Sequence, residues 1–311
     1  MSARRSRFEP INLLYGLMMG TADIVPGVSG GTIALIVGIY ERLIASIRAV
    51  ASAAASLARG QRGEARRHTR EAEWGFVLPL GFGIVTALLV GARLLEPLLE
   101  AYPVPFRSLF FGLIAASVAV PWKRIGQRIP RSYWIAAVAA LVAFVIVGLP
   151  PQVVSDPGML VIFLAASVAI CAMILPGVSG SFLLLVMGLY EPTLAALNGL
   201  DLRFIGVFIL GAAIGLGIFS KLLNHLLRNY HDATMAALVG LMIGSLRALW
   251  PYQDEARRLL PPPSGEALLS SLALAAIGFV LVVALVRFGL TMDEQRRRQT
   301  APDVDTPESQ V

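Results

Sequence analysis

Cysteine, histidine and charged side chains are scarce in this chain. Its single cysteine, Cys171, stands in an apolar run, which excludes an internal disulfide and a cysteine-based zinc cluster. Charged residues make up 15% of the 311 residues, against about 25% in soluble domains. Hydrophobic residues make up 56%, in runs that reach the roughly 20 residues needed to cross a bilayer. The sequence therefore predicts an all-α polytopic membrane protein, with no metal and no cofactor.

The charges that are present are mostly basic, with a net charge of +6 and a pI of about 9.9. In a soluble protein this balance would suggest a nucleic-acid partner. Here the basic residues fall between apolar runs, above all in 59–73 and 123–131, which is the positive-inside pattern of membrane topology. We therefore expect no nucleic-acid partner, a multi-pass protein of the cytoplasmic membrane, and both termini in the cytoplasm.

The apolar segments fall into two similar series. Each series begins with two segments around a break, whose arms either cross the bilayer or dip into it and return. Three further spans follow in each series. The predicted segments are 11–25, 32–50, 74–97, 104–122 and 132–149, and then 157–175, 179–199, 203–227, 233–250 and 267–288.

The two breaks carry nearly the same hexapeptide. Pro26-Gly27-Val28-Ser29-Gly30-Gly31 returns 150 positions later as Pro176-Gly177-Val178-Ser179-Gly180-Ser181. Proline and glycine interrupt helices, so each motif predicts a broken helical hairpin. Residues 9–149 and 157–288 would then be two units of one membrane domain, 1–311. Three spans per unit would invert the second unit, a design associated with secondary transporters. The polar end, 291–311, is expected to be a disordered cytoplasmic tail.

The motifs are candidate anion sites. Helices should resume near Thr32 and Phe182, and a helix N-terminus offers free N–H groups that favour a phosphate or chloride ion. The inverted symmetry would bring the two N-termini together around one such anion. Small residues also permit close helix packing in membranes, and that interpretation stays open. The candidate phosphate-binding residues are Gly27, Val28, Ser29, Gly30, Gly31, Thr32, Gly177, Val178, Ser179, Gly180 and Ser181.

A few charged residues near the breaks are further candidates. Asp23 has Met173 as its counterpart, and an acid in a membrane segment suggests proton coupling, although it could equally hold the turn. Glu41 and Glu191 follow the two motifs. A continuous helix would carry them about 15 Å from the break, to the headgroup level, which leaves anchoring and gating or coupling both open. Secondary headgroup contacts are expected from Arg42, Arg93 and Lys221, of which the last two could also only snorkel to the interface.

A serine hydrolase is the enzymatic alternative, because Gly27–Gly31 matches the G-x-S-x-G pattern. A serine nucleophile needs a base, normally histidine. His68, His225 and His231 all lie in loops or at span ends. The glycines are not followed by the lysine of a phosphate-binding loop. We therefore predict that the chain is not an enzyme.

Two stretches of the chain match one another. The first is Asp23-x-x-Pro26-Gly27-Val28-Ser29-Gly30-Gly31-Thr32 through Gly38-x-Tyr40-Glu41, and the second runs from Pro176 through Gly188-x-Tyr190-Glu191. Both stretches resemble the polyprenyl-phosphate transporter family. The resemblance covers roughly 10–290. It implies translocation of undecaprenyl phosphate from the outer to the inner leaflet of the bacterial inner membrane, for peptidoglycan and other envelope polymers. Its partners would be this lipid, membrane lipids and a coupling proton, with a homodimer left open. A small-anion channel or exchanger is the alternative.

Overall fold

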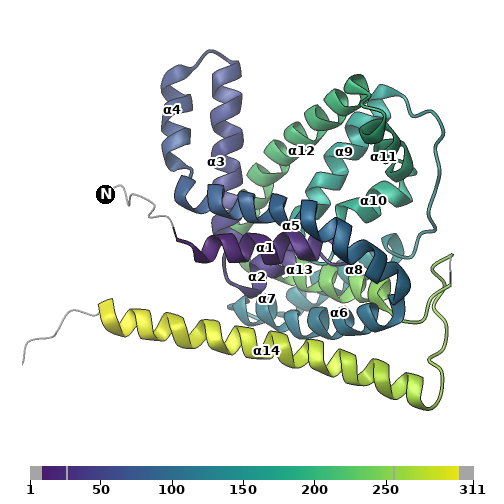
Figure 1. Cartoon of the computed structure of the whole chain (residues 1–311). Coiled ribbons are helices and arrows are strands. Elements are labelled where there is room, and N and C mark those ends of the chain that lie inside the picture. The colour runs from purple at the N-terminus through teal and green to yellow at the C-terminus, as the bar shows by residue number, and fades with distance from the viewer. Residues whose placement is uncertain (1–8, 26, 255, 301–311) are drawn as a thin grey trace, which may run out of the picture.

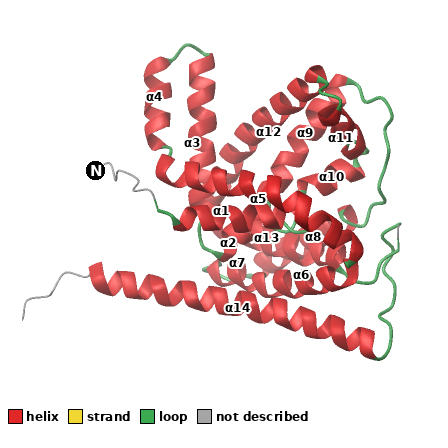
Figure 2. Ribbon diagram, viewed as in Figure 1, coloured by secondary structure: helices red, strands yellow, loops and turns green. Residues whose placement is uncertain are grey.

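The computed structural model describes residues 9–25, 27–254 and 256–300, and this part of the chain is built from helices joined by turns and loops (Figures 1 and 2). The helices of the first half are α1 (Ile11–Ile24), α2 (Gly30–Ile36), α3 (Tyr40–Ala58), α4 (Arg62–Glu71), α5 (Trp74–Ala101), α6 (Pro103–Ser117), α7 (Ala119–Arg124) and α8 (Pro130–Ile146). Those of the second half are α9 (Met159–Ile174), α10 (Gly180–Val186), α11 (Tyr190–Asn198), α12 (Leu202–Asn229), α13 (His231–Ser245), the 3₁₀ helix η1 (Leu246–Leu249) and α14 (Glu266–Thr300).

Five helical stretches in this described part are long and apolar enough to cross a bilayer: α5, α6 with α7, α12, α13 with η1, and α14. Each of them coincides with a span expected from the sequence. The sixth expected span, 132–149, forms the shorter apolar helix α8. The prediction of an all-α polytopic membrane protein is confirmed. α14 extends to Thr300, past the expected start of the tail at 291, and 301–311 lie outside the described residues.

Glycines bring four pairs of helices into close contact. α1 packs along α5 and α9 along α12, while α6 packs along α14 and α8 along α13. In these pairs a Cβ at Gly16, Gly211, Gly112 or Gly240 would collide with a backbone carbonyl oxygen of the partner helix, as is usual where membrane helices approach closely. The third span of each half therefore packs on the other half, which intertwines the two halves.

The order of elements repeats. α1, α2 and α3 are followed by α5, α6 and α8, just as α9, α10 and α11 are followed by α12, α13 and α14. The short α7 follows α6 as η1 follows α13, and among the helices of the described residues α4 alone has no counterpart. The inverted relation between the two halves remains a prediction.

The second arm of each break was expected to be one helix, and this prediction is wrong. α2 ends at Ile36 and α10 at Val186, and the chain turns by 107° between α10 and α11. Gly38 and Gly188 have φ angles of +80° and +76°. In both turns the amide after the glycine donates to the carbonyl five residues earlier, Ile39 N to Ala34 O at 2.9 Å and Leu189 N to Leu184 O at 2.8 Å. This is the Schellman termination that glycine favours, so Glu41 is not carried along a continuous helix from Gly31.

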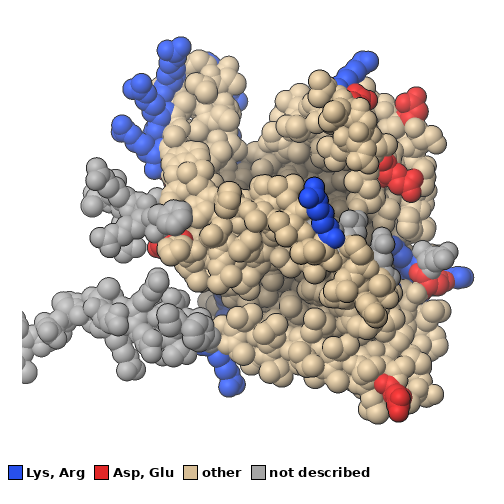
Figure 3. All heavy atoms as spheres, viewed as in Figure 1, with Lys and Arg blue, Asp and Glu red and all other residues tan. Residues whose placement is uncertain are grey.

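The arginine-rich stretch 59–73 was expected to be a loop, and it instead contains α4, which packs back along α3. Its arginine side chains gather at one side of the molecule, which we call the basic side (Figure 3). α1 begins and α14 ends at this side (Figure 1). The loops 147–158 and 250–265 lie at the opposite side, with most of the acidic side chains visible in this view.

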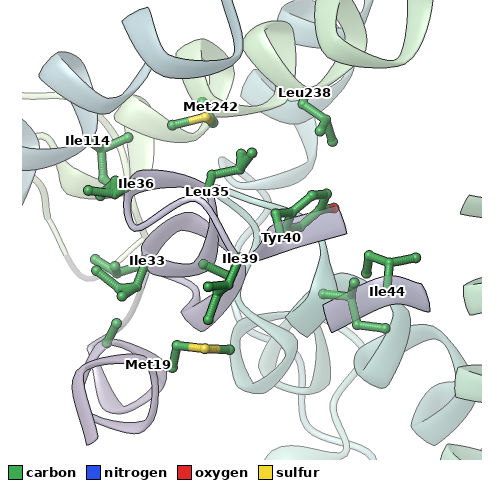
Figure 4. Close-up of a cluster of buried hydrophobic side chains, with 14 of the residues drawn as sticks. Met19, Ile33, Leu35, Ile36, Ile39, Tyr40, Ile44, Ile114, Leu238 and Met242 are labelled. Carbon is green, nitrogen blue, oxygen red and sulfur yellow. The ribbon is translucent and has the colours of Figure 1, made fainter. Parts of the chain in front are cut away.

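The largest hydrophobic core surrounds α2. Figure 4 shows side chains of α2 and of the turn after it packed against Met19 of α1, Ile114 of α6 and Met242 of α13. A second, smaller cluster joins α9, α10, α11 and α12 through residues such as Ile162 and Leu184. The first break and α2 therefore lie in the main core. α10, which follows the second break, contributes Leu184 to the smaller cluster, while Ile174 just before the second break belongs to the main core.

Candidate functional site at the contact of the two breaks

The two breaks lie together, as the sequence led us to expect. The Ser29 hydroxyl donates to the carbonyl oxygen of Met173 at 2.8 Å, and the Gly177 amide donates to the Thr32 hydroxyl at 3.0 Å. Gly31 packs so closely that a Cβ there would collide with the Ile174 carbonyl oxygen. Residues 144 and 145 positions apart in sequence thus form one buried polar contact, in which Ser29 and Thr32 have no solvent exposure.

The amides at the start of α2 are already satisfied within the first break. The Gly30 amide donates to the Asp23 carboxylate at 2.7 Å, and the Gly31 amide donates to the Ser29 hydroxyl at 3.0 Å. The Thr32 amide donates to the Ser29 carbonyl oxygen at 2.9 Å. A carboxylate is a favourable partner for a helix N-terminus, so Asp23 holds the place that an external anion would take.

The corresponding amides of α10 are less fully bonded. The Ser179 and Ser181 hydroxyls contact one another at 2.9 Å, and the Phe182 amide donates to the Ser179 hydroxyl over a long 3.4 Å. Within the described residues no hydrogen-bond partner lies within reach of the Gly180 and Ser181 amides. Ser179 is buried and Ser181 is exposed, so the second break exposes one hydroxyl group, that of Ser181, whereas the Ser29 and Thr32 hydroxyls of the first break are buried.

Both breaks pack against the same helical segment, which is formed by α13 and η1. Gly27, with a φ of +86°, contacts Ala248 and Leu249, whereas Gly177, with a φ of +84°, contacts Ser245. A side chain at either glycine would meet backbone strain as well as these neighbours. Val28 and Val178 next to them are buried. Pro26 lies outside the described residues.

The acidic and basic candidates away from the breaks are not gathered there. Glu41 is half-exposed and lies 3.7 Å from both Arg124 and His231, and Glu191 is exposed. Arg42 pairs with Glu73 at 2.6 Å and stacks on Phe76. Arg93 lies at an exposed position on α5, and Lys221 lies at an exposed position on α12.

The histidines lie elsewhere too. His68 contacts Glu71 on α4, His225 contacts Asn229 on α12, and His231 contacts Glu41 and Asp232. Among the described residues, none of the three is a hydrogen-bond partner of Ser29 or Ser179. The part of the chain that the structure describes also holds no cluster of side chains suited to a metal ion.

A cavity of about 230 Å³ adjoins the first break and was not expected from the sequence. It is lined on one side by Val25 and Gly27 and holds two arginines, Arg107 of α6 and Arg257 of the 250–265 loop. Arg107 is an ionisable residue near the start of a predicted span, and that signal alone marks it as a functional candidate. No local pattern pairs it with Arg257.

The chain was compared with known proteins. A family model described as undecaprenyl phosphate translocase-like matches residues 19–264. The chain belongs to this translocase-like family. A curated polyprenyl-phosphate transporter of Vibrio cholerae serotype O1 is 38% identical over 298 residues, which cover 90% of this chain and 95% of the relative. One of Staphylococcus aureus (strain NCTC 8325 / PS 47) is 31% identical over 299 residues, which cover 90% and 97%. No solved structure gives a significant match. The resemblance seen in the sequence is confirmed.

Proposed function

We propose that this member of the translocase-like family moves undecaprenyl phosphate, or a similar polyprenyl phosphate, across the bacterial cytoplasmic membrane. The lipid would return to the inner leaflet for envelope polymer synthesis. The observation that carries the proposal is the direct contact between the breaks, where Ser29 reaches Met173 and Thr32 reaches Gly177. Such interrupted helices near a repeat interface are where secondary transporters bind their substrates. In this proposal the basic side, with both termini, faces the cytoplasm.

The substrate's chemistry fits a polar contact inside an apolar protein. A phosphate monoester carries about −1.5 to −2 charges at neutral pH, so the headgroup needs polar partners inside the membrane, whereas the polyprenyl tail can stay in lipid. The candidate partners are the Ser179 and Ser181 hydroxyls and the neighbouring amides of α10. The first break, Gly27 to Thr32, would supply the opposite wall. Small residues there let the backbone approach the phosphate.

In this proposal, protonation of Asp23 controls whether the phosphate can enter the site. Its carboxylate accepts from the Gly30 amide at 2.7 Å, and a second anion at the same helix start would be repelled by it. A proton on Asp23 removes that repulsion and frees the amide for the phosphate. Phosphate entry and protonation of Asp23 would then be coupled.

The packing indicates which part would move. Because α8 packs on α13 and α14 on α6, rocking one whole half against the other would separate both pairs. The helices α9 to α12 share a smaller cluster of their own, and only parts of α9 and α12, such as Ile174 and Leu223, also belong to the main core. In our proposal this unit tilts to expose the contact alternately to the two sides. Because the second break joins α9 to α10, it moves with this unit.

Transport into vesicles tests the function. The full chain would be reconstituted in liposomes with a fluorescent short-chain polyprenyl phosphate, and the lipid left in the outer leaflet would be measured with a membrane-impermeant quencher. We expect the chain to move this lipid out of the outer leaflet. The matching polyprenol, which has no phosphate, should stay in the outer leaflet. The serine variant S181W, which fills the exposed face of α10, should reduce the rate at least tenfold.

Chloride flux in the same vesicles separates the alternatives. Fast chloride flux without lipid movement would mean that the chain is a small-anion channel or exchanger. Lipid movement at the wild-type rate by both S181W and S29W would contradict the assignment of the phosphate to the breaks. A control at an exposed position at the start of α12, R203Q, should leave the rate unchanged.

A further inference from the structure

The arginine cavity lies at the side of the molecule opposite the basic side. Its walls come from five places in the chain: the first break, the corner between α5 and α6, the 147–158 loop, η1 and the 250–265 loop. Its lining combines apolar side chains, among them Leu99 and Phe106, with the polar Gln253 and Asp254, so the two guanidinium groups of Arg107 and Arg257 stand partly in apolar surroundings. Arginines in such surroundings are costly unless an anion accompanies them.

Among the described residues, the guanidinium group of neither arginine makes a hydrogen bond or an ion pair; the side chains of Glu96 and Glu100 and the whole of Glu255 lie outside them. Asp254, the acid that lines the cavity, is bound to Arg258 at 2.6 Å and accepts from its amide at 2.8 Å. Burial and the nearby charge of Arg107 lower the pKa of Arg257 to about 10. At neutral pH both arginines remain charged, and the two like charges face one cavity.

Arg257 is held in place by a hairpin within the 250–265 loop, where Gln253 and Leu259 form an antiparallel bridge. Its φ of +59° is unusual for a residue other than glycine, and such a conformation persists only where the surroundings enforce it. The Arg257 amide donates to the Asp254 carbonyl oxygen at 2.9 Å, and the Gln253 side chain donates to three carbonyl oxygens, those of Arg247, Ala248 and Trp250. The base of the hairpin is thus fastened to η1, one wall of the cavity.

Arg257 also joins the cavity to the second break. Its guanidinium carbon lies 4.2 Å from the ring centroid of Phe182 in α10. The cavity itself reaches Gly27 in the first break. An anion bound between the arginines would therefore lie beside both breaks.

We propose that Arg107 and Arg257 form the docking site for the phosphate monoester head of the lipid before it enters the contact between the breaks. This inference rests on the proposed function and adds residues that the motifs do not contain. Arginine presents several donors in a planar fork and binds phosphate with two parallel hydrogen bonds. The volume of about 230 Å³ is below the roughly 300–1,000 Å³ of pockets that enclose drug-sized ligands. It suits a headgroup whose tail stays outside.

Equilibrium binding to the purified full chain in detergent micelles tests this site. The probes are a fluorescent short-chain polyprenyl phosphate, the matching polyprenol, and inorganic phosphate as a competitor. We expect R107Q and R257Q each to weaken binding of the lipid phosphate by about tenfold or more, the effect of losing a hydrogen bond between charged groups. Polyprenol binding should not change. Inorganic phosphate should displace the lipid phosphate from the wild-type chain.

The matched control is R203Q, which removes the same charge from an exposed position at the start of α12. It should bind as the wild type does, and the melting temperatures of all variants should agree. Unchanged lipid-phosphate binding by both cavity variants would overturn the proposal, as would an equal loss of polyprenol binding. Binding of inorganic phosphate without the lipid would also overturn it, in favour of a soluble ligand.

Vesicle transport distinguishes the failure of this site from failure of the proposed function. A wild-type chain that does not move the lipid contradicts the proposed function. Full transport by R107Q and R257Q beside an active wild type overturns only the docking site.

Discussion

The first and second breaks share a motif and an order of elements, yet their surroundings differ. All seven residues of α2 are buried, and they belong to the main core. In α10 only Gly180, Phe182 and Leu184 are buried, and Leu184 belongs to the smaller cluster. A repeated sequence has therefore given one enclosed helix and one that is partly open.

The same difference is found in the hydrogen bonds. The first break has an acid, Asp23, on the Gly30 amide, whereas the equivalent position in the second break is Met173, which contributes only its backbone carbonyl to Ser29. The second break has a hydroxyl at Ser181 where the first has Gly31. We infer that the breaks are not two equal half-sites: the first is a fixed wall and the second supplies free donors.

The largest effect should come from filling the contact at Gly31. A Cβ there collides with the Ile174 backbone, and overpacking of this kind costs about 1–3 kcal/mol. We expect G31A to lower the melting temperature in detergent and to abolish lipid transport. The matched change in the second break, S181A, lies on an exposed surface and should alter stability by less than about 0.5 kcal/mol. Equal destabilisation by the two variants would contradict the distinction between a closed and an open break.

Removing the charge of Asp23 should have the next largest effect, and it should act on pH dependence. D23N keeps an oxygen acceptor for the Gly30 amide but cannot titrate. If protonation of Asp23 admits the phosphate, the wild-type rate rises as the pH falls through the titration of Asp23, and D23N lacks this rise. The phosphate titrates near pH 6 in both chains, so the difference between their rate profiles in vesicles is the measure.

D23A separates this role from support of the turn. It removes the cap on α2 and should cost about 1 kcal/mol of stability, whereas D23N should melt close to the wild type. M173L, at the equivalent position, should change neither property. Identical pH profiles for D23N and the wild type would leave Asp23 with the structural role alone.

The sequence was sufficient for the spans and for the breaks, because long apolar runs and the Pro-Gly pairs act locally. It also indicated that the breaks meet. The turn at Gly38 was missed because one glycine in an apolar run is common in membrane helices, although its repetition at Gly188 was a usable signal. The many arginines of the stretch 59–73 did not indicate that it contains the helix α4. The arginine cavity could not be predicted, because it joins Arg107 to a loop far along the chain through tertiary packing.

The two glutamates that follow the motifs should give the smallest effect. Glu41 lies 3.7 Å from Arg124 and from His231, with 53% of its side chain exposed, and exposed ion pairs contribute about 0.2–1 kcal/mol. E41Q should therefore lower stability slightly, and E191Q, at an exposed position, should lower it less. Neither should slow lipid transport more than about twofold, since a twofold change corresponds to only about 0.4 kcal/mol. If E191Q alone slowed transport tenfold while the melting temperature held, the second break would contain a gating acid that its structural surroundings do not reveal, and the contrast between the breaks would have to include it.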